Sequence, residues 1–360
     1  MPEPGLTKRN WTNVLSEKAT TSGWGLCIGA GTSRPLFPDW QKLVDDLIAR
    51  DPNVSNPSAL SSELGEVFSL DALIEASRDR LGLSSGVFAR RLSKYLYATI
   101  KTKVGKNDWP LVLQALTAGS PGQLTRTEWA KFLSKVLAIS PHLSAFQIAE
   151  VVHTASARDL PPSAILSFNA EPLLYALINA VSAREALPNK RLKDYRLLDR
   201  VTRGISYRKA GRIPFIFCHG LMRVEGGYKL FNKSTAQDKL VFSEGEYLQL
   251  ANSAFTWQSS LFLGTAVFRS MVFVGLSFTD PNLRRWLAWI QKNKVTELRS
   301  KGKHEEVYGH YWIKSMEGTT PTSRRWFESA VRHLGVRLVW IENWEQTGLC
   351  LREMLGFKIS

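Results

Sequence analysis

The sequence predicts an α/β fold: a Rossmann-like, mostly parallel sheet with helices on both faces and a helical insertion subdomain. Short apolar runs of four to six residues recur along the chain, each bounded by a turn or by the start of a helix. Such runs are typical of strands that are buried on both faces of a parallel sheet. Amphipathic stripes with helical spacing separate several of the runs, and this alternation favours a sheet covered by helices.

The expected strands are residues 24–28, 164–167, 214–218, 239–242, 271–274, 308–313 and 336–341. Helical stripes between them cover residues 40–48, 174–181 and 283–290. The stretch from about 52 to 160 shows helical faces without alternation, so we expect a helical subdomain inserted between the first two strands. Residues 1–51 and 161–360 would then form the Rossmann-like domain, and residues 52–160 the insertion.

Composition narrows the class of protein. The 360 residues are 44% hydrophobic and 22% charged, which is enough to bury a large core. No run approaches the roughly 18 apolar residues of a membrane span, and residues 1–10 lack the apolar stretch of a secretory signal. Cys27, Cys218 and Cys350 lie far apart and form no C-x-x-C pair. We therefore expect a cytoplasmic protein without a disulfide framework or a four-cysteine zinc site.

The net charge of +15 is unevenly distributed. Residues 184–212 hold ten Lys and Arg against three acids, and residues 284–303 hold seven bases against Glu297. Residues 39–79, by contrast, carry nine acids and three bases. This asymmetry fits solvated helix faces, and it also fits a surface that attracts a polyanion or an acidic partner. We expect the segment 184–212 to form a basic loop or a further helix.

Four polar or glycine-rich motifs each follow directly on an expected strand. The first is Gly29-Ala30-Gly31-Thr32-Ser33, whose glycines would let the backbone approach a pyrophosphate closely. Arg34 stands where a dinucleotide fingerprint has its third glycine, and G-x-G turns also close many strands for steric reasons.

The second motif is SFNAE (167–171), which places Asn169 at the exit of its strand. The third is His219-Gly220, where an imidazole at the end of an apolar strand is well placed to act as a general base. Each has an ordinary explanation, because Asn is common in strand-to-helix turns and a lone His is more often structural.

The fourth motif is GLSFTDPN (275–282), in which Asp280 and Pro281 suit the start of the next helix. Capping does not explain Gly275 or Ser277, which would suit close contact with a ribose or an adenine. Ligands of open α/β sheets bind beyond the carboxyl ends of the strands, where the strand order reverses. Four such motifs on one edge therefore favour a ligand site there.

In this order the motifs resemble those of the sirtuin family, in particular its bacterial branch of NAD-hydrolysing domains used in antiphage defence. The matching segments read GAGTSRPLFPDW, SFNAE, FCHG and GLSFTDPN. The segment LVFSEGEYLQL (240–250) is similar to the family's strand, acidic pair and tyrosine before a long helix. The resemblance covers residues 24 to about 290, outside the helical insertion.

Some positions depart from the family pattern. Phe168, Ala170 and Glu171 replace the usual Thr, Tyr and Asp of the second motif, and Asp39-Trp40 stands where deacetylating sirtuins carry Asp-Phe-Arg. Those deacetylases also carry a four-cysteine zinc module, which three scattered cysteines cannot supply. The resemblance therefore implies NAD hydrolysis, with NAD as substrate and no zinc.

The resemblance also implies roles for single residues. Asn169 would hold a water and His219 would take its proton while the nicotinamide–ribose bond breaks through an oxocarbenium-like ribose. Gly29, Ala30, Gly31, Thr32 and Ser33 would hold the pyrophosphate. The remaining NAD-binding positions would be Asp39, Gly275, Ser277 and Asp280.

Two alternatives stay open at this point. The site could sense NAD or ADP-ribose without turnover and serve to assemble a partner. The basic segments could instead mark a nucleic-acid-binding protein, although no nuclease metal cluster or nucleic-acid motif is recognisable. Proteins that this chain resembles work as oligomers, often with a HerA-type ATPase or an Argonaute-like protein. The resemblance thus implies a homo-oligomer that a partner controls and that acts by abortive infection.

Overall fold

The structure, a computed structural model, describes most of the chain. The described residues are 5–8, 10–189, 191–202, 210–222, 224, 241, 244–246, 248, 256–301 and 308–357.

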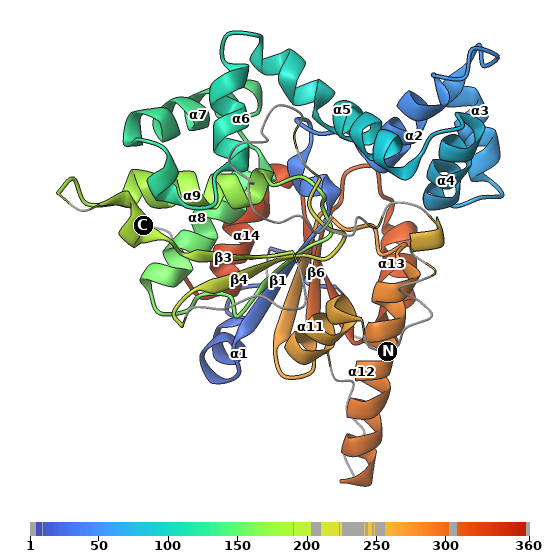
Figure 1. Cartoon of the computed structure of the whole chain (residues 1–360). Helices are drawn as coiled ribbons and strands as arrows, with labels where there is room; N and C mark the ends of the chain where they lie inside the picture. Colours follow the sequence, from blue (N-terminus) through green and yellow to red (C-terminus); the bar gives the residue numbers. More distant parts are fainter. Residues whose placement is uncertain are drawn as a thin grey trace.

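Seven described strands form one parallel sheet in the order β3-β4-β2-β1-β5-β6-β7 (Figure 1). They are β1 (Trp24–Ile28), β2 (Ile165–Ser167), β3 (Leu198–Val201), β4 (Ile213–Phe217), β5 (Ser270–Val274), β6 (His310–Ser315) and β7 (Val336–Ile341). Every residue of β1, β2, β4 and β5 is buried, as expected for central strands with both faces covered. The predicted α/β class with a Rossmann-like sheet is confirmed.

The strand order reverses beside β1. Strands β2, β4 and β3 lie on one side of β1, and β5, β6 and β7 lie on the other. The register pairs Ile28 of β1 with Ser167 of β2 and with Val274 of β5, and it pairs Ser167 with Phe217 of β4. The carboxyl ends of these four central strands are therefore level with one another.

Alternate residues of each strand face two different cores, and helices cover both (Figure 1). Leu26 and Ile28 face the larger core, whereas Cys27 faces the smaller one. The larger core lies under α1 (Ser16–Thr21), α2 (Trp40–Ile48), α8 (Ser144–Ala157), α9 (Leu173–Glu185) and α14 (Thr347–Met354). The smaller core lies under α11 (Trp257–Ala266), α12 (Pro281–Ser300) and α13 (Pro321–Arg332).

The long connection from β1 to β2 is helical, as its pattern predicts. After α2 it forms α3 (Pro57–Gly65), α4 (Leu70–Arg80), α5 (Ser85–Val104), α6 (Trp109–Thr117) and α7 (Arg126–Ile139), and it ends with α8. Residues 52–160, all of which the structure describes, contain no strand. The division into a Rossmann-like domain and an insertion subdomain stays a prediction.

The prediction for the segment 184–212 was wrong in one respect, because part of it forms β3. This is an edge strand with Asp199 and Arg200 in its middle, so it lacks the apolar run that marks the central strands. Asp199 is held by Arg196 (3.5 Å) and Arg212 (3.2 Å). The expected strand at 239–242 and the family-like segment 240–250 lie largely outside the described residues.

Because His310 is buried, we expect the protein to lose stability in acid. Its side chain at the start of β6 is 2% exposed, and its Nδ1 accepts a hydrogen bond from the backbone N–H of Met271 (3.2 Å). Burial lowers the pKa of His310 from 6.5 to about 3, with a further contribution from Lys294 and Lys18. The folded chain keeps the ring neutral, whereas the unfolded chain binds a proton below about pH 6.5. The free energy of unfolding should therefore fall by about 1.4 kcal/mol per pH unit as the pH drops from 6.5 towards 3.

The variant His310→Asn keeps an acceptor for Met271 and removes the titrating ring. Its urea unfolding should depend less steeply on pH than that of the wild type between about pH 6.5 and 4.5, where most carboxyl groups are still ionised. His142, whose side chain is 64% exposed, offers the matched control His142→Asn. An unchanged slope in His310→Asn would show that another group causes the acid sensitivity.

Candidate active site

The four motifs lie at the carboxyl ends of four neighbouring strands. Gly29 follows β1, Phe168 follows β2, Cys218 follows β4 and Gly275 follows β5. Because the sheet order is β4-β2-β1-β5, these motifs come together on one edge, next to the point where the strand order reverses.

The first and fourth motifs pack directly against each other. The N–H of Gly31 donates to the carbonyl of Gly275 (3.0 Å), and the N–H of Thr32 donates to the carbonyl of Gly29 (3.1 Å). A Cβ on Gly29 would lie 2.5 Å from the Gly275 carbonyl oxygen. The glycines therefore allow two turns to touch, and three of the N–H groups expected to bind a pyrophosphate, those of Gly29, Gly31 and Thr32, are engaged within the protein. A pyrophosphate contact by this loop stays a prediction.

Gly275→Ala should destabilise the fold strongly. Gly275 has a φ of +69°, and a Cβ there would lie 2.6 Å from the Thr32 backbone nitrogen. We expect the free energy of unfolding to fall by at least about 2 kcal/mol, because strain and a backbone clash add. Gly318 has a φ of +67° with no atom within 4 Å of its Cβ position, so Gly318→Ala isolates the strain. If urea unfolding shows the same loss of unfolding free energy in both variants, the two turns are not tightly packed against each other.

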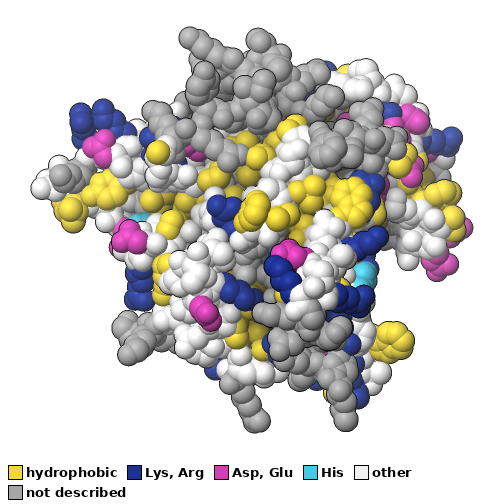
Figure 2. All heavy atoms as spheres, turned by 90° about the horizontal axis from the view of Figure 1, so that it is seen from below, with side chains coloured by type: hydrophobic (Ala, Val, Ile, Leu, Met, Phe, Trp, Pro, Cys, Tyr) yellow, Lys and Arg dark blue, Asp and Glu magenta, His cyan; other side chains and the backbone are white. Residues whose placement is uncertain are grey.

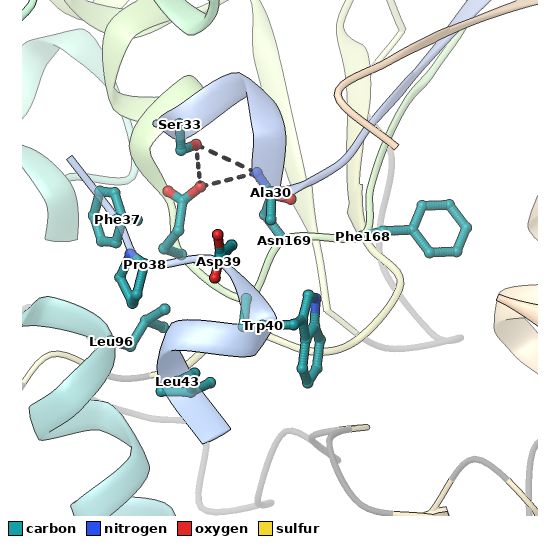
Figure 3. A pocket seen from close by; sticks show the side chains of 12 residues that line it. Ala30, Ser33, Phe37, Pro38, Asp39, Trp40, Leu43, Leu96, Phe168 and Asn169 are labelled. Atoms are coloured by element: carbon teal, nitrogen blue, oxygen red, sulfur yellow. Dashed lines mark hydrogen bonds between the residues drawn. The ribbon is translucent and has the colours of Figure 1, made fainter. Parts of the chain in front are cut away.

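A pocket opens at the ends of β1 and β2 (Figure 3). Its walls come from the 3₁₀ turn η1 (Ala30–Ser33), the loop before α2, the first turn of α2, one position of α5 and the loop after β2. The lining residues are Ala30, Ser33, Phe37, Pro38, Asp39, Trp40, Leu43, Leu96, Phe168, Asn169, Ala170 and Glu171. The first and second motifs thus share one pocket, and the helical connection contributes to its wall through Leu96.

Ser33, Asn169 and Glu171 form a buried polar cluster in this pocket (Figure 3). The Oγ of Ser33 donates to Oε1 of Glu171 (2.5 Å), and Nδ2 of Asn169 donates to the same Oε1 (2.9 Å) and to Ser33 Oγ (3.3 Å). The other carboxylate oxygen, Oε2, accepts from the backbone N–H of Leu173 at the start of α9 (2.5 Å). One carboxylate therefore fixes the serine, the amide and the beginning of a helix.

Glu171 is a site residue that the sequence did not reveal, since a glutamate just before a helix is most simply explained by the helix dipole. Burial raises the pKa of its carboxyl group above the ordinary value, and hydrogen bonds from Ser33, Leu173 and Asn169 offset part of that effect. The signal that could have identified it is its place two residues after Asn169, where the resembling family has an Asp.

The orientation of Asn169 leaves one atom without a partner. Its amide nitrogen faces Glu171 and Ser33, so its carbonyl oxygen Oδ1 points elsewhere, and this buried oxygen accepts no hydrogen bond. The side chain as a whole is 4% exposed. A buried acceptor without a donor is costly, by about 1–3 kcal/mol, unless a water or a ligand satisfies it. Asn169 therefore keeps one hydrogen-bond acceptor whose donor is not among the described residues.

His219 lies beside this pocket, outside the set of described residues that line it. Strands β2 and β4 are paired, so His219 after β4 lies at the strand end next to Asn169 after β2. The two loops stay in contact further on, where the N–H of Met222 donates to the carbonyl of Ala170 (2.8 Å). The His219 ring packs edge-on against Phe168 (centroids 5.1 Å apart), and the Phe168 side chain points away from Asn169 (Figure 3). The structure thus brings the expected catalytic pair to neighbouring strand ends, with Phe168 beside the imidazole.

Asp280 faces His219, at 3.6 Å from Oδ2 to Nε2. It also caps α12, because Oδ1 accepts from the N–H groups of Asn282 (2.8 Å) and Leu283 (3.3 Å). Burial alone would raise the pKa of Asp280, but the contact with His219 and the two backbone N–H groups lower it below the ordinary value. The capping role that the sequence predicts is present, and the carboxylate in addition provides a charged partner for the imidazole.

Two further expected NAD-binding residues have structural partners of their own. Asp39 lines the pocket, caps α2 by accepting from the N–H of Lys42 (2.7 Å), and pairs with Arg34. Ser277 is exposed, and its hydroxyl lies 2.7 Å from that of Thr279. Contact of either residue with NAD stays a prediction.

Among the described residues there is no group of three or more His, Cys, Asp and Glu side chains that could hold a metal ion. Cys27, Cys218 and Cys350 are buried as free thiols. No helix in the described part of the chain is both long enough and apolar enough to cross a membrane.

A parallel sheet with its pocket at the carboxyl ends, beside a reversal of strand order, defines a Rossmann-like ligand-binding fold. Residues 212–333 match the family model of the SIR2-like domain, and the chain therefore carries a sirtuin-like domain. A SIR2-like domain indicates an NAD-related function. The match includes His219 and the GLSFTDPN motif, while the pocket residues precede it. No curated protein matches the chain.

Proposed function

We propose that the protein is an NAD⁺ hydrolase that cleaves the nicotinamide–ribose bond. The observation that supports this most strongly is the buried cluster of Ser33, Asn169 and Glu171, which leaves the Asn169 Oδ1 free to accept a hydroxyl group. The pocket provides this acceptor between apolar walls, which suits a ribose that carries a flat aromatic ring.

The chemistry needs little acid catalysis. Nicotinamide is cationic in NAD⁺ and neutral once released, so it departs without protonation and leaves an oxocarbenium-like ribose. The protein must then position a water and remove its proton. Asn169 can hold that water or a ribose hydroxyl through Oδ1, because Glu171 and Ser33 prevent its amide from turning. Glu171 is thus a positioning residue for Asn169.

His219 is the proposed general base on the neighbouring strand end. Asp280 orients its imidazole and stabilises the positive charge that the ring gains with the proton. A carboxylate of lowered pKa remains ionised at neutral pH, as this role requires. The His–Asp contact and the orphaned amide oxygen thus supply a base and a water-binding group from adjacent strands.

The biological setting that we propose is NAD depletion in the cytoplasm during antiphage defence by abortive infection. A homo-oligomer under the control of a separate HerA-type ATPase or Argonaute-like protein would keep this toxic activity silent until infection. These proposals rest on the resemblance of the motifs, together with the matched SIR2-like domain.

Product analysis separates hydrolysis from the sensing alternative. NAD⁺ is incubated with the purified protein, alone and with lysate from phage-challenged cells, and nicotinamide and ADP-ribose are quantified. Hydrolysis gives the two products in equal amounts. Binding of NAD⁺ without product under both conditions would favour a module that senses NAD or ADP-ribose.

A further inference from the structure

The second half of α12 projects away from the rest of the described structure. Figure 1 shows its carboxyl-terminal turns extending beyond the sheet and its neighbouring helices. No residue from 291 to 301 is buried, whereas Leu283, Trp286, Leu287 and Ile290 of the first half are part of the smaller core. Val295 and Leu298 continue the packed stripe of the first half and are half-buried, whereas Lys292, Asn293, Thr296, Glu297 and Arg299 are exposed, so one face of this segment is open to a partner.

Helix α12 is strongly basic. Residues 281–301 carry six bases and a single acid, Glu297, which is paired with Lys301 (2.7 Å). The bases are Arg284, Arg285, Lys292, Lys294, Arg299 and Lys301. Figure 2 shows Lys and Arg side chains on the face seen from below, with an acidic side chain among them. This surface therefore attracts anions.

An exposed tryptophan lies within one stripe of these bases. Arg285, Trp289, Lys292 and Arg299 follow one another at spacings of four, three and seven residues, which places them on one face of the helix. Trp289 is 41% exposed, and the Arg285 guanidinium stacks over its ring at 5.3 Å. Lys292 and Arg299 are exposed.

Helix α13 lies beside α12. Arg284 of α12 donates to the carbonyl of Ala330 in α13 (3.4 Å), so the two helices are neighbours. Trp326 on α13 is 73% exposed and follows directly on Arg324 and Arg325. The single acid of α13, Glu328, is held by the Trp340 indole N–H (2.8 Å). Both helices thus combine exposed aromatic rings with an excess of positive charge.

We propose that α12 and α13 form a binding surface for single-stranded nucleic acid. Lys292 and Arg299 contact phosphates of the strand, and Trp289 stacks on an unpaired base. Basic residues that track a backbone, combined with aromatic rings on which bases stack, are the two elements of sequence-tolerant single-strand binding. An acidic protein is the competing occupant of such a surface, and the comparison with poly-glutamate below separates the two. This proposal is independent of NAD hydrolysis.

The test uses fluorescence anisotropy of the full chain with labelled oligo(dT) and oligo(U) of about 30 nucleotides over a series of salt concentrations. Two variants separate the phosphate contacts from the base stacking. Lys292→Gln with Arg299→Gln should make the salt dependence shallower, by about 0.7 per lost phosphate contact in the slope of log K against log salt. Trp289→Ala should weaken binding about 5- to 150-fold and leave that slope unchanged.

A charge-matched control is Lys94→Gln with Lys131→Gln, since both lysines are exposed on the distant helices α5 and α7. This control should bind with nearly the affinity of the wild type, since it lowers only the overall positive charge. Three results would overturn the proposal: no binding by the wild type at low salt, equal binding by Trp289→Ala and wild type, or tighter binding of poly-glutamate than of oligo(dT).

Discussion

Replacing Asn169 by Ala is expected to lower the rate of nicotinamide release by at least about 100-fold, measured where the wild type is active. The reason is geometric. Asn169 presents the one buried oxygen of the pocket cluster that has no partner, and Ser33 and Glu171 hold it in that orientation. Ala offers neither the acceptor nor the donor, so neither the water nor the ribose is held.

The matched control for Asn169→Ala is Asn179→Ala. Asn179 is a second buried asparagine, 1% exposed, which lies within α9 and outside the pocket lining. Both variants remove a buried amide, and activity is compared at a temperature at which melting curves show both variants to be folded. Only Asn169→Ala should lose activity. Equal loss of activity in both would mean that folding, and not chemistry, explains the effect.

His219→Ala is expected to lower kcat by about 10²–10⁴-fold, the usual contribution of a general base. Asp280→Asn should cause a smaller loss of kcat with little change in KM, because it removes the charge that faces His219 and leaves the imidazole in place. Replacing a residue that only binds NAD would instead raise KM and leave kcat unchanged.

Asp280 also caps α12, so its variants must separate stability from chemistry. Asn is as good an N-cap as Asp, whereas Asp280→Ala loses the cap at a cost of about 1 kcal/mol. Asp280→Asn should therefore keep the thermal stability that Asp280→Ala loses, while both lose activity. If Asp280→Asn is fully active, the His–Asp contact is purely structural.

Strands that are buried on both faces were the easiest part of the fold to predict. The bounds of β1 and β7 agree with the apolar runs in the sequence, and those of β2, β4, β5 and β6 agree to within two residues at each end. Burial favours apolar side chains at most positions of such strands, so the sequence marks them directly. The edge strand β7 is buried at five of its six positions and is marked in the same way, whereas the edge strand β3 carries Asp199 and Arg200, which are typical of a loop.

The site was predictable only in part, because sequence shows which residue follows a strand and not which side chains meet. The edge location of the four motifs follows from the parallel sheet alone. The contact of Gly31 with Gly275, however, joins segments about 240 residues apart, and the contact of His219 with Asp280 joins two different strand ends. Glu171 escaped notice because its partner Ser33 lies far away in the chain.

The most direct test of the central claim is a crystal structure of Asn169→Ala with NAD⁺, a variant in which the substrate should persist uncleaved. The account predicts intact NAD⁺ with its nicotinamide-bearing ribose in the pocket beside Ser33 and Glu171, and with His219 on the same side of the sheet edge. NAD⁺ bound at another surface, or an empty pocket at saturating NAD⁺, would contradict it.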